Sequence, residues 1–206
     1  MTDVFDVLFV CTGNICRSPM AEIIFAGRLR AQLGSGADSF RVHSAGTNGL
    51  DGYPINAPAA SAIAHLGFDT TEFRARALNE AMLAECDLVL TAMRHHRGSV
   101  VRLLPRMTSR TFTIREFGRF SAAIDPAQLP AGPVVRRARA LVELAAAQRG
   151  QQFVLSREDD IDDPYGGRQS EFAESVDLIE AAFEPVLRLL SATTVAGSGD
   201  IEKRHR

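Results

Sequence analysis

The sequence predicts an α/β fold, a single three-layer domain in which a four-stranded parallel sheet carries helices on both faces. Four short runs rich in β-branched and aromatic residues alternate with segments whose apolar residues recur at helical spacing. Such an alternation is typical of a parallel sheet covered on both sides. The length of 206 residues, with 46% hydrophobic and 23% charged residues, is that of one globular domain with a good core.

The first strand and the first helix are predicted from local chemistry. Residues 4–10 form an apolar run that ends in turn-forming residues, which predicts a buried strand. From Pro19 to Leu33 the apolar residues fall near helical spacing. Ser18 suits an N-cap, Pro19 suits the first helical position, and Gly34 ends the helix.

The remaining elements follow the same patterns along the chain. Further strands are predicted at residues 40–46, 88–93 and 111–114, and further helices at residues 59–67, 79–86, 99–107, 134–150 and 170–190. Pro185 is expected to kink or end the last helix. Residues 118–133 contain three prolines and are predicted to be a loop. The domain is predicted to span residues 1–190, followed by a flexible tail at 191–206.

Charge and cysteine content limit the possible partners. The net charge of −2 gives no reason to expect nucleic acid, and the start, MTDVFDVLFV, resembles neither a signal peptide nor a membrane span. A cytoplasmic location without membrane insertion is therefore predicted. Cys11, Cys16 and Cys86 are expected to stay reduced, and without Cys-x-x-Cys spacing they predict no metal site.

The string CTGNICR, residues 11–17, has the chemistry of a phosphate-binding loop. It lies between the carboxyl end of a strand and the start of a helix, where successive N–H groups and the helix dipole attract an anion. Gly13 and Asn14 tolerate the positive φ that a tight loop demands. Arg17 offers a planar pair of donors that matches two phosphate oxygens. The predicted phosphate-binding residues are Thr12, Gly13, Asn14, Ile15, Cys16, Arg17 and Ser18.

Cys11 adds a nucleophile to this loop. The donors that hold an oxyanion also stabilise a thiolate, and Ser18 can donate a further hydrogen bond. A thiolate at the floor of a phosphate site can attack phosphorus and form a cysteinyl-phosphate intermediate. The leaving group then needs a general acid, and the string IDDPYGG, residues 161–167, supplies Asp162 and Asp163 as candidates. This chemistry requires no cofactor.

Three motifs together resemble the low-molecular-weight protein-tyrosine phosphatase family. These are VCTGNICRSP at residues 10–19, HSAGT at 43–47 and DPY at 163–165. The resemblance covers residues 4–117 and 159–190 in one chain order. It implies a four-stranded parallel sheet and hydrolysis of phosphotyrosine in tyrosine-phosphorylated protein substrates, with a tyrosine kinase target among the candidates.

The resemblance also implies roles for individual residues. Cys11 would be the nucleophile, Arg17 the phosphoryl-binding residue, and Asp163 the acid and then the base. Asn14 and Ser44 would brace the loop, Ser18 would stabilise the thiolate, and Cys16 could form a reversible disulfide with the nucleophile.

The chain departs from the family pattern at the pocket wall and in length. Leu50 stands where an aromatic residue is usual, and Tyr165 is followed by Gly166 rather than by a second tyrosine. Leu50 and Tyr165 are therefore predicted to form a wall that grips an aryl ring less firmly. Residues 118–158 account for the extra length as an insertion, whose helix is expected beside the acid. The oligomeric state is left open.

Two other functions remain open at this stage. The first is arsenate reduction on the same fold, which needs two further cysteines to pass a disulfide along, whereas Cys86 stands alone. The second is a non-catalytic module that binds phosphate or phosphotyrosine. Outside the motifs, His95 and His96 are expected at a solvated helix start, and the arginines at 136, 137 and 139 on a solvated face.

Overall fold

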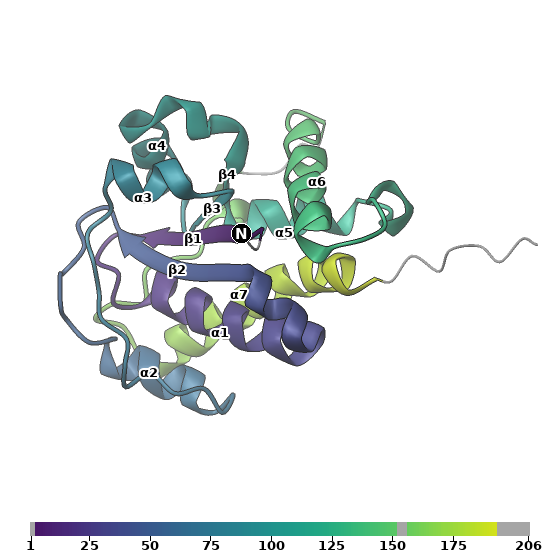
Figure 1. Cartoon of the computed structure of the whole chain (residues 1–206). Helices are drawn as coiled ribbons and strands as arrows, with labels where there is room; N and C mark the ends of the chain where they lie inside the picture. The colour runs from purple at the N-terminus through teal and green to yellow at the C-terminus, as the bar shows by residue number, and fades with distance from the viewer. Residues whose placement is uncertain (1–2, 152–155, 193–206) are drawn as a thin grey trace, which may run out of the picture.

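The computed structural model describes residues 3–151 and 156–192, and these residues form a four-stranded parallel sheet with helices packed on both faces (Figure 1). The strand order is β2-β1-β3-β4. The strands are β1 (Phe5–Cys11), β2 (Phe40–Gly46), β3 (Leu88–Thr91) and β4 (Thr111–Thr113). The predicted fold class and the four predicted strands are confirmed.

Strand β1 lies in the middle of the sheet, and all seven of its residues are buried. It pairs with β2 along its whole length and with β3 along four residues. The chain leaves β1 for a helix on one face and leaves β3 for a helix on the other face (Figure 1). In open parallel sheets such a reversal opens a crevice beyond the carboxyl ends of the two strands, and ligands bind there.

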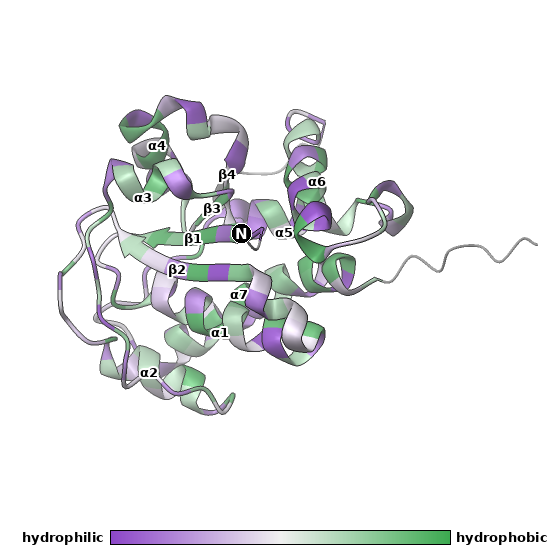
Figure 2. Ribbon diagram, viewed as in Figure 1, coloured by the Kyte–Doolittle hydropathy of each residue, from purple (hydrophilic) through white to green (hydrophobic). Residues whose placement is uncertain are grey.

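The helices form the two outer layers. Helices α1 (Arg17–Leu33) and α7 (Gln169–Ser191) cover one face, while α3 (Glu80–Glu85) and α4 (Arg94–Leu103) cover the other (Figure 1). The other helices are α2 (Ala57–Ala64), α5 (Ile114–Ala122) and α6 (Val134–Ala147), with short 3-10 turns at Gly34–Ser39, Pro105–Arg110, Pro126–Gln128 and Ser156–Asp159. The central strands are mostly hydrophobic and the helices show mixed faces (Figure 2).

The first helix begins earlier than the sequence predicts. Cys16 is its N-cap residue, and Arg17 is already helical. Ser18 does not cap the helix, because its hydroxyl is held among the polar side chains of the preceding loop. The prediction of Ser18 as N-cap is therefore wrong, and the hydroxyl is available to the loop instead.

The predicted loop at residues 118–133 is partly wrong, because its first residues belong to helix α5. Thr113 and Glu116 form a capping box that starts this helix, and the Thr-x-x-Glu spacing is visible in the sequence. Gly118 is the point of closest approach to α7, where an added Cβ would lie 2.5 Å from the carbonyl oxygen of Ala182. The glycine therefore serves helix packing rather than a turn.

Helix α6, predicted at 134–150, lies at the amino-terminal ends of the strands and not beside the acid. Arg139 on this helix donates to Asp3 and to Asp87, which come just before β1 and β3. The arginine cluster is not a uniformly solvated face, because Arg137 is buried and donates to the carbonyl oxygens of Pro130 and Leu189. The assignment of residues 118–158 as an insertion stays a prediction.

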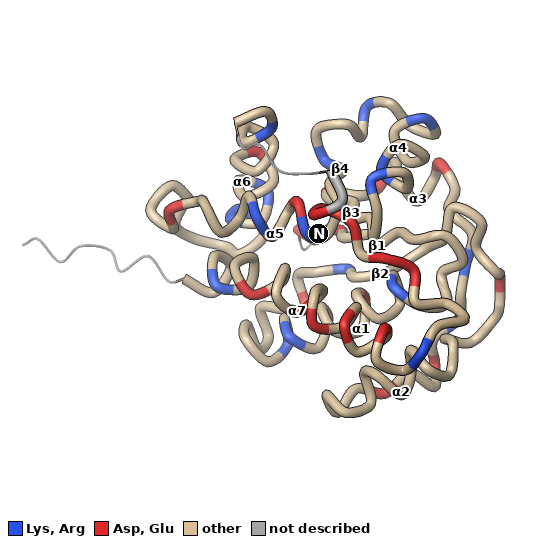
Figure 3. Tube along the Cα trace, turned by 180° about the vertical axis from the view of Figure 1, so that it is seen from behind, with Lys and Arg blue, Asp and Glu red and all other residues tan. Residues whose placement is uncertain are grey.

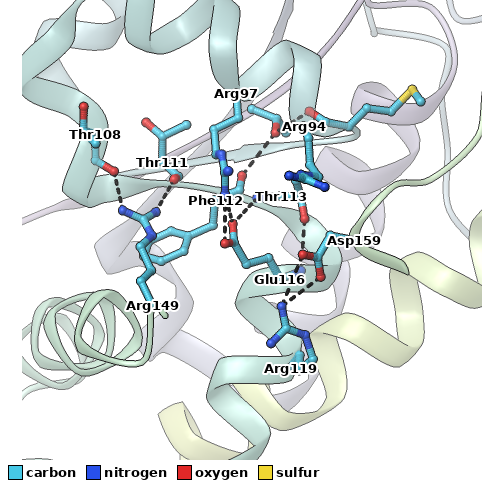
Figure 4. A network of polar contacts seen from close by, with 12 residues as sticks. Arg94, Arg97, Thr108, Thr111, Phe112, Thr113, Glu116, Arg119, Arg149 and Asp159 are labelled. Atoms are coloured by element: carbon cyan, nitrogen blue, oxygen red, sulfur yellow. Dashed lines mark hydrogen bonds and ion pairs between the residues drawn. The ribbon is translucent and has the colours of Figure 1, made fainter. Parts of the chain in front are cut away.

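Beyond α6, Arg149 connects this region to the edge strand β4. Its guanidinium stacks on Phe112 at 4.1 Å and donates to the carbonyl oxygens of Thr108 and Thr111 (Figure 4). All three residues of β4 are buried although the strand lies at the edge of the sheet.

Helix α7 continues through Pro185 without ending, so the expected stop is not observed. Charged residues of both signs are interspersed along the chain (Figure 3). Among residues 3–151 and 156–192, no helix combines the length and the apolar character that a membrane span requires. Most of the predicted tail, from residue 193 onward, lies outside the described residues.

Candidate active site

The loop between β1 and α1 is turned so that its amide groups face inward. The carbonyl oxygens of Cys11, Thr12, Gly13 and Ile15 accept hydrogen bonds from the amides of residues 47, 48, 50 and 56, at 2.7–3.1 Å. In a trans peptide the N–H of the next residue points opposite to the carbonyl. The loop N–H groups therefore converge on its inner side, where Asn14 adopts the positive φ of 56° that closes the turn.

The sulfur of Cys11 lies at the floor of this loop. Its side chain is 2% exposed, and Sγ lies 3.0 Å from the Ser18 hydroxyl oxygen. The Ser18 hydroxyl has a second acceptor within reach, the carbonyl of Ala45, but at 3.5 Å. The shorter contact favours a hydrogen bond from Ser18 to the sulfur.

A buried chain of hydrogen bonds connects Ser18 to the residues that surround the loop. Asn14 Nδ2 donates to Ser18 at 2.9 Å and to Ser44 at 2.7 Å, while its Oδ1 accepts from the Arg76 amide at 2.8 Å. Ser44 in turn donates to Glu22 at 2.5 Å. Since both amide hydrogens of Asn14 go to hydroxyl oxygens, Ser18 keeps its own proton to donate, with the Cys11 sulfur at 3.0 Å and the Ala45 carbonyl at 3.5 Å as its acceptors.

Glu22 ends this chain in a desolvated position. Burial raises the pKa of its carboxyl above the ordinary value, and the hydrogen bond from Ser44 opposes that shift. The predicted bracing residues Asn14 and Ser44 are therefore in contact with the loop, and Glu22 is a member of the chain that sequence reasoning missed.

Arg17 joins the loop to the segment that carries Asp163. One terminal nitrogen lies 2.7 Å from Asp163 Oδ2, and the other donates to the carbonyl of Ile161 at 3.0 Å. The side chain of Arg17 is 2% exposed, while that of Asp163 is 48% exposed. Arg17 Nε is buried without a partner among the described residues, so the protein does not use this donor. Asp162 is exposed and does not line the pocket, so of the two candidate acids only Asp163 faces the loop.

A pocket of about 280 Å³ opens over the loop. Its walls include both predicted residues, Leu50 and Tyr165, which are 40% and 64% exposed. Its lining residues are Cys11, Thr12, Gly13, Ile15, Cys16, Arg17, Asn48, Leu50, Asp163 and Tyr165. Asn48 was missed by sequence reasoning, although it follows the SAGT motif directly.

His96 also belongs to this region, contrary to the prediction of a solvated pair. It is fully buried in the first turn of α4, and its Nε2 lies 2.9 Å from the Thr12 hydroxyl. Burial first, and then the nearby His95 and Arg17, lower the pKa of His96 to about 3. The imidazole is therefore neutral, and it supports the loop through its contact with the Thr12 hydroxyl. The sequence carried no signal for this contact, because Thr12 and His96 are 84 positions apart.

The two remaining cysteines are buried free thiols. Burial, and then the neighbouring Cys11 and Asp163, raise the pKa of Cys16 to about 12. Cys86 contributes to the one group within the described ranges that has metal-ligand character, with Asp6 and His43. In this group Asp6 is already paired with His43 and with Arg41, and it lies at the opposite end of β1 from Cys11.

A buried cysteine in a phosphate-binding loop, with an arginine and a facing aspartate at the crevice of a parallel sheet, defines the class of cysteine-based phosphatases. Comparisons with known proteins are consistent with this class. The sequence model of the low molecular weight phosphotyrosine protein phosphatase family matches residues 6–128. The chain belongs to the low molecular weight protein-tyrosine phosphatase family, whose members are hydrolases that act through a cysteinyl-phosphate intermediate.

Individual relatives show how far the likeness extends. The chain is 33% identical over 183 residues to low molecular weight protein-tyrosine phosphatase A of Mycobacterium tuberculosis, covering 88% of this chain and 89% of that protein. It is 36% identical over 120 residues to a probable low molecular weight protein-tyrosine-phosphatase, EpsP, of Ralstonia nicotianae, covering 58% and 77%.

Solved structures share the fold. The low molecular weight protein tyrosine phosphatase of T. tengcongensis superposes with a TM-score of 0.65 at 28% identity, covering 89% of this chain and 98% of that one. The YwlE arginine phosphatase of Geobacillus stearothermophilus gives 0.64 at 22% identity, covering 98% and 99%. At that identity the second likeness concerns the fold alone.

Proposed function

We propose that Cys11 is the nucleophile of this tyrosine phosphatase, Arg17 its phosphoryl-binding residue and Asp163 its general acid and base. The observation that carries the proposal is the convergence of the three side chains on one pocket, with the Ser18 hydroxyl oxygen 3.0 Å from the Cys11 sulfur. In the first step the thiolate attacks phosphorus and the leaving oxygen takes a proton from Asp163. In the second step Asp163 takes a proton from a water molecule whose oxygen attacks phosphorus, and the phosphorus–sulfur bond breaks, which releases phosphate and restores the Cys11 thiolate.

The ion pair between Arg17 and Asp163 has a part in this cycle. A phosphoryl dianion entering the loop offers Arg17 two oxygens in place of one carboxylate. The exchange frees Asp163, which stays at the pocket rim because its segment is bound through Ile161. We therefore propose that substrate binding itself releases the acid toward the leaving oxygen.

We further propose that the aryl ring of phosphotyrosine lies between Leu50 and Tyr165. Both side chains line the pocket and leave its mouth open to solvent, which suits a side chain presented by a protein. The substrates are phosphotyrosine-containing proteins, and the target of a tyrosine kinase is one candidate among them. A cytoplasmic location is proposed because the mechanism requires Cys11 to remain a free thiol, as it is here.

The arsenate-reductase alternative finds little support in the structure. That chemistry needs a second thiol that can reach the nucleophile. Cys86 lies instead next to Asp6 and His43, at the far end of β1, and burial raises its pKa above the ordinary range. Cys16 is closer, but no third thiol of the chain accompanies it in the pocket.

The experiment compares turnover of peptides that carry phosphotyrosine, phosphoserine or phosphoarginine by the wild type and by Cys11→Ser. Turnover of the phosphotyrosine peptide alone, abolished in Cys11→Ser while inorganic phosphate still binds, supports the proposal. Trapping of phosphate on Cys11 by rapid quenching and mass spectrometry would identify the intermediate. Turnover that persists in Cys11→Ser would contradict the assignment of Cys11 as the nucleophile. Faster turnover of the phosphoarginine peptide would contradict the assignment of phosphotyrosine as the substrate class.

A further inference from the structure

The segment that carries Asp163 is bound to the rest of the protein mainly on the side that precedes it. Asp159 is buried and accepts two contacts from Arg119 of α5, at 2.9 and 3.2 Å. Figure 4 shows Arg119 directed at Asp159, next to the ion pair of Arg97 with Glu116. This end of the segment is therefore fixed to helix α5.

The next residue, Asp160, makes a contact of a different kind. Its Oδ1 accepts a hydrogen bond of 2.7 Å from the backbone N–H of Arg94, the first residue of helix α4. The N-cap residue of that helix, Met93, offers no side-chain cap. Because the first N–H groups of a helix lack partners within the helix, Asp160 supplies from a distant segment the cap that the local sequence lacks. Its negative charge also lies at the positive end of the helix dipole.

Backbone contacts of the same two residues complete the attachment. The carbonyl of Asp160 accepts from Arg115 at 3.0 Å. The N–H of Ile161 donates to the carbonyl of Ala92 at 2.9 Å, and the Ile161 side chain is fully buried. Position and direction of the chain are thus set at residues 159–161, immediately before the acid.

Beyond Ile161 the attachment weakens at two aspartates, although Pro164, directly after them, is buried again. Asp162 and Asp163 are exposed, and the ion pair of Asp163 is with Arg17, whose guanidinium the proposed substrate phosphoryl group would engage. Once that exchange has occurred, the location of the Asp163 carboxyl depends on its hydrogen bond of 3.3 Å from the Tyr165 amide and on the backbone that leads to it from Ile161. Asp163 lies only three residues after Asp160, a distance of at most about 10 Å along the chain. A shift of the backbone at residue 160 is therefore expected to move the acid.

We propose that Asp160 is a positioning residue for the reaction, which holds the Asp163 carboxyl over the phosphate loop by capping helix α4. The inference rests on the proposed role of Asp163 as general acid. The same first turn of α4 holds His96 against Thr12, so one helix end supports both halves of the site. Asp160 acts through the helix and through Asp163, and it does not line the pocket.

The hydrogen bond can be removed from either side. Asp160→Ala removes the acceptor, whereas Asp160→Asn keeps a side-chain oxygen that caps helices equally well. Arg94→Pro removes the donor at a helix position where proline is favoured, after a residue whose φ of −143° and ψ of 159° suit a following proline. Arg94→Ala keeps the N–H and controls for the lost side chain. Asp162→Ala controls for a lost charge in the same segment.

The assay measures kcat and KM for aryl phosphates whose phenols range from strongly to weakly acidic. For the weakly acidic phenol, which needs the acid, we expect kcat to fall roughly 10-fold or more in Asp160→Ala and Arg94→Pro. For the strongly acidic phenol we expect little change, and KM should stay constant. Asp160→Asn, Arg94→Ala and Asp162→Ala should behave as the wild type, and thermal unfolding should show that each variant is folded.

Asp163→Asn is measured in parallel and separates the two proposals. If it loses activity on the weakly acidic phenol while Asp160→Ala does not, the positioning role is wrong and the acid assignment stands. If Asp163→Asn behaves as the wild type, the acid assignment falls and the positioning role falls with it. A loss in Asp160→Ala that is equal for all phenols, or a loss in Asp160→Asn as large as in Asp160→Ala, overturns the positioning role. Should Asp160→Ala fail to fold, Arg94→Pro against Arg94→Ala decides.

Discussion

In the phosphate loop, residues 11–18, the side chains of Cys11, Asn14 and Ser18 are buried and linked by hydrogen bonds. In the facing segment, residues 159–165, Asp163 is 48% exposed and is held by the ion pair with Arg17 and by a hydrogen bond of 3.3 Å from the Tyr165 amide. In the proposed mechanism the loop holds a dianion and a thiolate in fixed positions, which favours donors that are already in place. In the proposed mechanism the facing segment delivers a proton and then accepts one, so its carboxyl has to exchange partners during the cycle. The comparison indicates that one half of the site is preorganised and the other is tethered.

The largest expected effect comes from Arg17, because it belongs to both halves. Arg17→Lys keeps the positive charge but loses the planar pair of donors and the contact with Ile161. We expect kcat to fall roughly 10²- to 10³-fold, as for the loss of an oxyanion donor. Stopped-flow or steady-state kinetics with a phosphotyrosine peptide would measure it. An activity close to that of the wild type would show that a single positive charge is sufficient. The planar guanidinium of Arg17 would then not be needed to connect the phosphate loop with the facing segment.

The next prediction concerns the preorganised half alone. Asn14→Ala leaves Ser18 free to direct its proton away from the sulfur and leaves the Arg76 amide without its acceptor. We expect kcat to fall roughly 10- to 100-fold, because a buried hydrogen-bond partner is worth about 1–3 kcal/mol when lost. Unlike the effect of Asp163→Asn, this loss should be the same for all leaving groups. A loss confined to poor leaving groups would contradict the division between the two halves.

The third prediction concerns His96, which contacts the loop through Thr12, and it is tested by the pH dependence of stability rather than by activity. The pKa of His96 is lowered by burial from 6.5 to about 3, so the unfolded state binds a proton more readily than the folded state. The corresponding stabilisation is complete above about pH 6.5 and is lost progressively as the pH falls toward 3. In His96→Gln, which can still contact Thr12, this part of the acid sensitivity should disappear.

The measurement is urea unfolding of both proteins at several pH values between 7 and 4. The free energy of unfolding of the wild type should fall faster with decreasing pH than that of the variant. Parallel curves would mean that His96 is protonated as easily in the folded protein as in the unfolded chain.

The smallest expected effect lies at the rim of the tethered half. Tyr165→Leu removes an aromatic side chain that is 64% exposed, so only part of its surface can contact a substrate ring. We expect KM for a phosphotyrosine peptide to rise by a few fold with kcat nearly unchanged, since the contact is the same in the ground state and the transition state. Leu50→Phe is the matched change on the opposite wall and should lower KM. A large fall in kcat in Tyr165→Leu would place this residue with the acid rather than with the substrate ring.

The sequence predicts the parts of this molecule whose signals are local. Each of three features can be recognised from a few neighbouring residues: the strand that leads to Cys11, the loop glycine and the Asp-Pro dipeptide. The place of the site at the carboxyl ends of the strands follows from the alternation of strands and helices, whereas the strand order is known only from the structure.

Contacts between distant segments could not be read in this way. His96 and Asp160 look like solvated polar residues in the sequence, and only the packing of α4 against both loops gives them partners. Arg137 was assigned to a solvated face because charged residues usually lie there, but the backbone carbonyls around it provide enough acceptors to bury it. The start of α5 is a different case, because the Thr113–Glu116 capping box was visible and the nearby prolines outweighed it.

The stacking of Arg149 on Phe112 has a consequence for the behaviour of the chain among its own copies. A border strand with unpaired carbonyl groups is a template on which another polypeptide can add itself. In β4 the outward carbonyl of Thr111 is already taken by a guanidinium whose flat face covers the adjoining ring. Self-association through this side of the sheet would first have to dislodge that cation, which gives a three-residue strand a safeguard against aggregation.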